Sequence, residues 1–171
     1  MTDLISLASD KTSSRKAKTS KTFDVLGPHI QFLTTLSDAD DGHCVIRSTF
    51  PAGVIVPIHS HGDRETFYIL DGALQALRED HWVTLAGGDI FDVPGTTKHA
   101  FRNASGASVS LLFVTTMRMG RFFRDIGRPA AAVQPGPPTP EILGHFFETA
   151  QRYGYWLGGP ADNAAVGLSF G

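Results

Sequence analysis

With 171 residues, 42% of them hydrophobic, the chain can form one domain with a real core, and wholesale disorder is excluded. The formal net charge of -2 gives no reason to expect a nucleic-acid partner. Cys44 is the only cysteine, so an internal disulfide and a cysteine-based zinc cluster are excluded. No apolar run approaches the length of a membrane-spanning helix, and no basic residue precedes the short apolar patch near the N-terminus, as a signal peptide requires. We therefore expect a soluble, cytoplasmic protein that binds neither nucleic acid nor membranes.

Residues 1–21 differ from the rest of the chain because they carry scattered cations among serine and threonine. These cations are Lys11, Arg15, Lys16, Lys18 and Lys21. A transit peptide has a similar composition, but Asp3 and Asp10 count against it. A basic arm for nucleic acid is a second alternative, and the absence of aromatic residues among the cations favours a solvated tail instead. We predict a mobile N-terminal arm that could also pack on a neighbouring subunit.

Short apolar segments separated by turn residues follow from Phe23 to Thr115. The predicted strands are residues 30–33, 44–50, 54–61, 65–70, 73–78, 81–85, 90–94, 99–102 and 109–115. Asp71-Gly72 is a strong hairpin signal, and Glu79-Asp80 is a second tight turn. Many short strands at close, regular spacing predict an all-β protein built as an antiparallel sandwich or barrel.

After Thr116 the pattern changes from strand to helix. We predict a short amphipathic helix ending at Gly127, a proline-rich linker over residues 130–138, and a second helix that begins at Thr139-Pro140 and ends at Gly154. The chain thus divides into an arm (1–21), a β-barrel (22–117) and a C-terminal helical extension (118–171). We expect the extension to pack on the barrel or on a partner subunit.

Three potential metal ligands, His59, His61 and Glu65, lie within seven residues. Alternate residues of a strand share a face, so the two histidines point the same way, and an antiparallel partner strand would place Glu65 opposite them. His99 is a fourth candidate. Imidazole and carboxylate together suit a divalent transition metal with open coordination positions. The plainer alternative, in which each side chain is structural or solvated, fits any one of them taken singly.

At these residues the chain resembles the cupin superfamily, which has two sequence motifs. The spacing of the first motif is matched by Gly53, His59, His61, Glu65 and Gly72. The spacing of the second is matched by Gly88, Pro94, His99 and Asn103. One departure is that the glycine of the second motif stands one place early, at Gly95, with Thr96 in its usual position. That departure concerns a turn and not a ligand.

The resemblance covers roughly residues 45–116 and implies a double-stranded β-helix, which is a small jelly-roll barrel. It also implies a homodimer and one divalent transition metal per chain, whether iron, manganese, nickel, copper or zinc, held by His59, His61, Glu65 and His99. In dioxygenases of this superfamily the motif glutamate can leave the metal and act as a base, so Glu65 would be catalytic. The C-terminal features, a Phe-Phe-Arg-Asp-Ile-Gly run and a Leu-Gly-Gly-Pro stretch, resemble bacterial single-domain cupins grouped as quercetin-dioxygenase-like.

Strand parity predicts which side chains share the interior with the ligands. If the histidines and Glu65 face inward, then Ile55, Phe67, Ile69 and Phe101 do so as well. The resulting pocket would set a polar metal cluster against an apolar wall and would suit an aromatic small molecule. The alternative is that these four residues simply fill a small core.

Three functions follow from this site. The first is a metal-dependent dioxygenase that acts on a flavonol-like or other enolisable aromatic compound. The second is a non-redox isomerase or lyase in which a metal polarises a carbonyl and a side chain moves a proton. The third is a binding protein in which the metal only holds the ligand. The sequence favours the first through its resemblance, and the fold alone does not decide among them.

Overall fold

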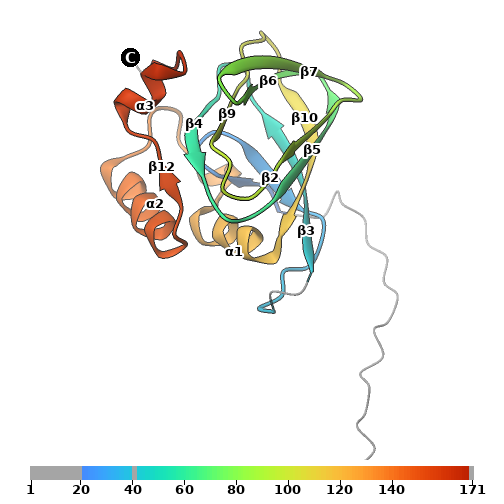
Figure 1. Ribbon diagram of the computed structural model, residues 1–171. Coiled ribbons are helices and arrows are strands. Elements are labelled where there is room, and N and C mark those ends of the chain that lie inside the picture. Colours follow the sequence, from blue (N-terminus) through green and yellow to red (C-terminus); the bar gives the residue numbers. More distant parts are fainter. Residues whose placement is uncertain (1–20, 40–41, 170–171) are drawn as a thin grey trace, which may run out of the picture.

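The computed structural model describes residues 21–39 and 42–169, so the predicted N-terminal arm lies outside the described residues except for Lys21 (Figure 1). One sheet contains β1 (Phe23–Asp24), β2 (His29–Phe32), β3 (His43–Phe50), β5 (Glu65–Asp71), β8 (Ile90–Val93), β10 (Val109–Thr116) and β11 (Arg128–Pro129). The other contains β4 (Ile55–Ser60), β6 (Ala73–Arg78), β7 (His81–Ala86), β9 (His99–Arg102) and β12 (Trp156–Leu157). The helices are α1 (Met117–Ile126), α2 (Pro140–Arg152) and α3 (Pro160–Ala165), and a 3-10 turn spans Ala130–Ala132. Across this described part of the chain, no helix has the length and apolar character needed to cross a membrane.

The two antiparallel sheets face each other and enclose the core. Their strand orders are β11-β1-β2-β3-β10-β5-β8 and β12-β4-β9-β6-β7. The prediction of an all-β jelly roll with short C-terminal helices is confirmed.

Strands β3 and β10, at the centre of the larger sheet, show a regular alternation of buried and less buried residues. The buried residues are Cys44, Ile46, Ser48 and Phe50 on β3, and Val109, Leu111, Phe113 and Thr115 on β10. Because the side-chain period of a strand is two, this alternation turns one face of each strand toward the core and the other toward solvent. The two strands pair along their full length, from Val109 opposite Phe50 to Thr116 opposite His43.

The expected hairpin at Asp71-Gly72 is not formed. Strand β5 pairs with β10 and β8, whereas β6 pairs with β7 and β9, so the turn carries the chain from one sheet to the other. Gly72 has a φ of 86°, and a Cβ there would lie 3.1 Å from the carbonyl oxygen of Ser108. This crowded left-handed turn therefore requires glycine. A tight hairpin would require glycine for the same reason, so the residue alone does not distinguish a hairpin from a crossover. The second predicted turn, at Glu79-Asp80, does join the paired strands β6 and β7.

The C-terminal extension contains both predicted helices, and each begins at a threonine cap. The Thr116 hydroxyl accepts a hydrogen bond from the Met119 N–H at the start of α1, and Thr139 does the same for Ile142 at the start of α2. The extension also contributes one short strand to each sheet, β11 beside β1 and β12 beside β4. In Figure 1 its orange and red segments lie along the side of the barrel formed by β4. The extension thus covers the strand that carries His59.

Candidate metal centre

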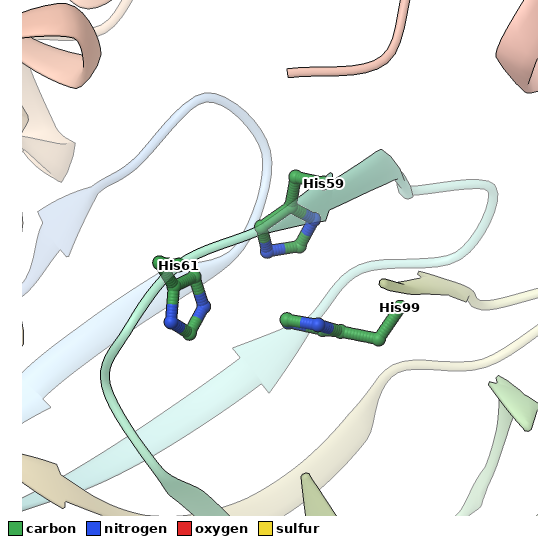
Figure 2. Close-up of side chains that lie close together, drawn as sticks. All are labelled: His59, His61 and His99. Atoms are coloured by element: carbon green, nitrogen blue, oxygen red, sulfur yellow. The ribbon is translucent and has the colours of Figure 1, made fainter. Parts of the chain in front are cut away.

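Three histidines from two neighbouring strands of the smaller sheet converge inside the barrel (Figure 2). His59 lies on β4, His61 follows directly after that strand, and His99 is the first residue of β9. One ring nitrogen of each lies within 4.8 Å of the corresponding atoms of the other two. The ring centroids of His59 and His99 are 4.1 Å apart, and those of His61 and His99 are 5.0 Å apart. The structure thus brings together the histidines that the motif spacing selected.

An irregularity in the pairing of β4 with β9 decides which residues face inward. Val56 pairs with Phe101, but the next pair is His59 with His99, so β4 contains one residue more than β9 between these positions. Such a bulge shifts the face on which the following side chains lie. Parity along an unbroken strand placed Ile55 on the face of the histidines, whereas Val56 takes the inner position beside Phe101. The parity argument for Ile55 fails at this bulge, because Ile55 packs against the smaller apolar cluster that includes Ile58, but Ile55 still lines the cavity described below.

Glu65 reaches the histidines from the opposite sheet. We expected it on a strand paired directly with the histidine strand, but β5 pairs with β10 and β8 and belongs to the larger sheet. The carboxylate is buried, with Oε2 3.0 Å from Nε2 of His99 and Oε1 3.5 Å from Nε2 of His61. The four predicted ligands therefore meet across the barrel interior, and not along one hairpin.

Backbone carbonyl groups orient all three imidazole rings in the same way. The Nδ1 atoms of His59, His61 and His99 lie 2.8, 3.0 and 2.8 Å from the carbonyl oxygens of Pro57, Asp63 and Thr97, respectively. A carbonyl oxygen can only accept, so each Nδ1 carries the proton. In the neutral ring the lone pair is then on Nε2, which is the arrangement found where imidazole binds a metal.

The inner atoms of this cluster lack hydrogen-bond partners within the protein. In the described part of the chain, four buried side-chain atoms have none, and three of these are His61 Nε2, Glu65 Oε2 and His99 Nε2. Although Oε2 of Glu65 lies 3.0 Å from Nε2 of His99, both atoms are acceptors when the imidazole proton is on Nδ1, so neither can donate to the other. Buried polar atoms are almost always satisfied, and inward-facing lone pairs on nitrogen and oxygen are satisfied together by a cation. The donor set therefore fits a divalent transition metal.

The surroundings favour the ionisation states that metal binding requires. Burial raises the pKa of Glu65, but the neighbouring His61 and His99 outweigh burial and bring it down to about 2, so the group is a carboxylate at neutral pH. Burial, followed by the charge of His99, lowers the pKa of His59 to about 3, which keeps this imidazole neutral. A carboxylate and a neutral imidazole are the forms that act as ligands.

The cluster lies at the wall of a cavity of about 780 Å³. His59, His61 and Glu65 line it together with a largely apolar surface that includes many aromatic rings. The aromatic lining consists of Phe50, Phe67, Phe101, Phe113, Phe122, Phe123, Phe146, Phe147 and Tyr155. Among the described residues that line it, none is Lys, Arg or Asp. The volume is that of a pocket for a small organic molecule.

Of the predicted pocket residues, Ile55, Phe67 and Phe101 line this cavity, and Ile69 does not. Ile69 is fully buried in the core, where it pairs with Leu111 of β10. Ile69 faces inward like Phe67, but it lies two residues beyond Phe67 on β5 and is therefore further from Glu65. At that depth neighbouring side chains fill the barrel. The expectation for Ile69 is therefore corrected: it is a core residue.

The displaced glycine of the second motif has a structural explanation. A Cβ on Gly95 would lie 2.5 Å from the carbonyl oxygen of Gly62, so the backbones of these two loops leave no room for a side chain. Thr96 therefore takes the left-handed conformation itself, with a φ of 70°, and its N–H donates to the carbonyl oxygen of His61. The motif residue Asn103 is fully buried, and its amide donates to three backbone carbonyl groups, so its role is structural.

The sequence reasoning missed a buried polar network next to His61. The Asp63 carboxylate accepts hydrogen bonds from Thr116, from Arg118 at 2.7 Å and from the Tyr155 hydroxyl at 2.8 Å. Burial, followed by the charge of Asp63, raises the pKa of Tyr155 well above its ordinary value, so the hydroxyl remains a donor. Asp63 lies between two predicted ligands, but its partners are 53, 55 and 92 residues away, and no local pattern indicates them.

Comparison with known proteins agrees with this architecture. The family model described as a cupin domain matches residues 46–115. The polyketide cyclase RemF from Streptomyces resistomycificus superposes with a TM-score of 0.56 at 16% identity, covering 63% of this chain and 80% of the cyclase. A predicted oxalate decarboxylase from Thermotoga maritima gives 0.55 at 18% identity, with 61% and 98% covered. An RmlC-like cupin from Shewanella frigidimarina gives 0.52 at 17% identity, with 62% and 91% covered. A comparison with curated proteins found no significant match.

At these identities the solved structures show the fold alone. The histidine motif lies inside the matched segment, and the two-sheet architecture extends beyond it on both sides. The protein therefore has the cupin fold, and its residues 46–115 match the family model described as a cupin domain.

Proposed function

We propose that this protein is a metal-dependent enzyme that acts on a small aromatic, enolisable compound, and that its reaction is a dioxygenation. The observation that carries the metal-dependent part is the set of buried, unpartnered atoms of His61, Glu65 and His99, two of which, those of His61 and Glu65, belong to residues that line an aromatic cavity. The resemblance of the C-terminal segment to quercetin-dioxygenase-like cupins favours dioxygenation among the possible reactions.

His59, His61 and His99 would hold the metal, with Glu65 as a fourth ligand. When bound, the metal supplies a Lewis acid that lowers the pKa of a substrate hydroxyl, together with the redox chemistry that dioxygen requires. Three imidazoles and a carboxylate leave about two positions of an octahedral site free. Carbonyl groups fix the imidazole tautomers, so the histidines are already arranged for binding.

Glu65 is the group in this cluster best placed to accept a proton. Its carboxylate is ionised at neutral pH, buried, and exposed to the cavity on the side of the metal ligands. Removing the hydroxyl or α-carbon proton of a substrate would need such a base within hydrogen-bond reach. We therefore assign Glu65 two roles, ligand and proton acceptor.

The cavity lining indicates the chemistry of the substrate. Phe67 and Phe113 are stacked with ring centroids 4.7 Å apart, and Phe101 lies 4.7 Å from Phe67. A planar aromatic molecule would continue this ring packing. Among the described lining residues Glu65 is the only carboxylate, and no Lys or Arg is present to neutralise a phosphate or carboxylate. A sugar phosphate or a small dicarboxylate would therefore be poorly accommodated.

A second candidate is an isomerase or lyase that uses the same site without dioxygen. The ionised, buried Glu65 favours it, because proton transfer beside a Lewis acid needs no redox metal. The solved structures that share the fold include proteins described as a cyclase and as a predicted oxalate decarboxylase, so the fold does not choose the reaction.

The test begins with the metal content of the purified protein, measured by elemental mass spectrometry, and continues with oxygen uptake on a panel of flavonols and related enolisable aromatics. One iron, manganese, nickel or copper per chain with substrate-dependent uptake would support the dioxygenase. Turnover of the same compounds without oxygen would support the second candidate. Binding of the compounds with no turnover under either condition would contradict both and indicate a binding protein.

We also infer a homodimer, for which the outer face of the larger sheet is suited. Tyr68, Leu70, Ile90 and Val114 are exposed on adjacent strands β5, β8 and β10, with Tyr68 paired directly with Ile90. Contiguous exposed apolar side chains are typical of protein contacts. Sedimentation analysis tests this inference, and the mass of a monomer at micromolar concentration would contradict it.

A further inference from the structure

The loop between β4 and β5 carries His61 and is tied to distant parts of the chain through one buried carboxylate. Asp63 is 4% exposed, and its backbone carbonyl oxygen accepts the hydrogen bond that orients the His61 ring. Its Oδ1 atom accepts from the Thr116 hydroxyl at the start of α1. Its Oδ2 atom accepts from both Arg118 and the Tyr155 hydroxyl. Side chain and carbonyl belong to the same residue, so the network that holds one also places the other.

Tyr155 contacts the ligand loop in two ways. Its hydroxyl donates to Asp63 at 2.8 Å, and its ring centroid lies 5.0 Å from that of His61. Two further contacts fix the position of the tyrosine. Its N–H donates to the carbonyl oxygen of Ala150 in α2, and its ring centroid lies 4.6 Å from that of Phe122. Tyr155 also lines the cavity, so it adjoins the ligand loop on one side and the substrate space on the other.

We propose that Tyr155, acting through Asp63, is a positioning residue for the metal ligand His61. The inference rests on the metal site proposed above and adds that the C-terminal extension sets the geometry of that site. Groups that orient a metal ligand through a hydrogen bond typically change metal affinity by about 10–100-fold when they are removed. The orienting chain here is Tyr155 hydroxyl, Asp63 carboxylate, Asp63 carbonyl and His61 Nδ1.

The decisive variant is Tyr155→Phe, which keeps the ring against His61 and removes only the hydroxyl. Tyr153→Phe is the matched control. It comes from the same segment and also removes a tyrosine hydroxyl that donates to an aspartate, but that aspartate is Asp125 and not Asp63. Zn²⁺ affinity is measured by competition with a chelator, and the copper-loaded proteins are compared by electron paramagnetic resonance. Metal-free unfolding of each variant shows that the domain is folded.

We expect Tyr155→Phe to weaken Zn²⁺ binding by about tenfold and to alter the copper spectrum while three imidazole nitrogens remain bound. Tyr153→Phe should leave both readouts unchanged. Arg118→Gln provides a second route to the same carboxylate if Tyr155→Phe fails to fold, because Arg118 is partly exposed and donates to the same oxygen. It should weaken Zn²⁺ binding in the same direction.

Three results would overturn the inference, and they can be told apart. If Tyr155→Phe and Arg118→Gln match the wild type in Zn²⁺ affinity and copper spectrum, the positioning role is wrong while the metal site stands. If the wild type itself shows no imidazole coordination of copper, the proposed metal site is wrong and the inference fails with it. An equal loss of affinity in Tyr155→Phe and Tyr153→Phe would also count against positioning, since it would reflect general loosening of the extension.

Discussion

Metal binding should stabilise the folded protein by several kcal/mol, and the structure allows the size of this effect to be worked out. His61 Nε2, Glu65 Oε2 and His99 Nε2 are buried without hydrogen-bond partners. Each such atom costs about 1–3 kcal/mol, so the three together cost the metal-free protein about 3–9 kcal/mol. A metal that binds all three relieves this cost in the folded state only. Mass action limits the observed gain to about 2.7 kcal/mol at a free metal concentration 100 times the Kd, and to about 4.1 kcal/mol at 1,000 times.

The measurement is unfolding in urea and by heat, with the protein first stripped by a chelator and then loaded with Zn²⁺, Mn²⁺ or Ni²⁺ in turn. For a domain of this size a gain of about 3 kcal/mol raises the Tm by about 6–12 °C. His61→Ala should lose most of the metal-dependent gain, because it removes one of the converging nitrogens. His81→Ala is the matched control, since His81 is an exposed histidine on β7 whose ion-pair partner is the exposed Asp80. It should retain the gain in full.

The reasoning would be refuted if no metal changed the unfolding free energy of the wild type beyond the change seen for His61→Ala. A gain of equal size in both proteins would place the metal elsewhere in the chain. Loss of the gain in His81→Ala would also contradict the assignment, because that residue lies on an exposed hairpin and contributes nothing to the cluster.

Three further predictions concern single residues of the site. Glu65→Gln keeps the shape of the side chain and removes its charge, so metal affinity should fall by more than about 100-fold and turnover should stop; affinity and turnover close to wild type would exclude Glu65 as ligand and base. Thr96→Gly should raise the unfolding free energy by about 0.5–1 kcal/mol, because threonine is strained at a φ of 70° and its side chain is exposed; a loss of stability in urea unfolding would contradict this. In the metal-free protein the pKa of His59 is about 3 in the folded state, against an ordinary value of 6.5. Between these two pH values the unfolded chain therefore binds a proton at His59 that the folded protein does not bind. Stability should therefore fall as the pH decreases from about 6.5 to about 3, and less steeply in His59→Gln; identical slopes in the two proteins would refute the assignment.

The positions of most strands along the chain follow from the sequence alone. So does the identity of the histidine cluster. Alternating apolar residues in β3 and β10 require a sheet with one buried face, whatever the rest of the chain does. Thr139, followed by proline and a helical pattern, predicts where α2 begins, because capping is a local interaction. The spacing of His59, His61 and His99 within two motifs identified the converging nitrogens, since the fold that the motifs imply brings those positions together.

The tertiary structure alone decided how these elements meet. Asp71-Gly72 satisfies the local demands of a hairpin and of a crossover equally, so only the pairing of β5 with β10 reveals which one is formed. The bulge in β4 is set by its pairing with β9, some forty residues further along the chain, and it is this pairing that sets Val56, and not Ile55, opposite Phe101. The contacts of Asp63 with Arg118 and Tyr155 join residues 55 and 92 positions apart. Such contacts depend on the path of the whole chain, so local sequence propensity does not predict them.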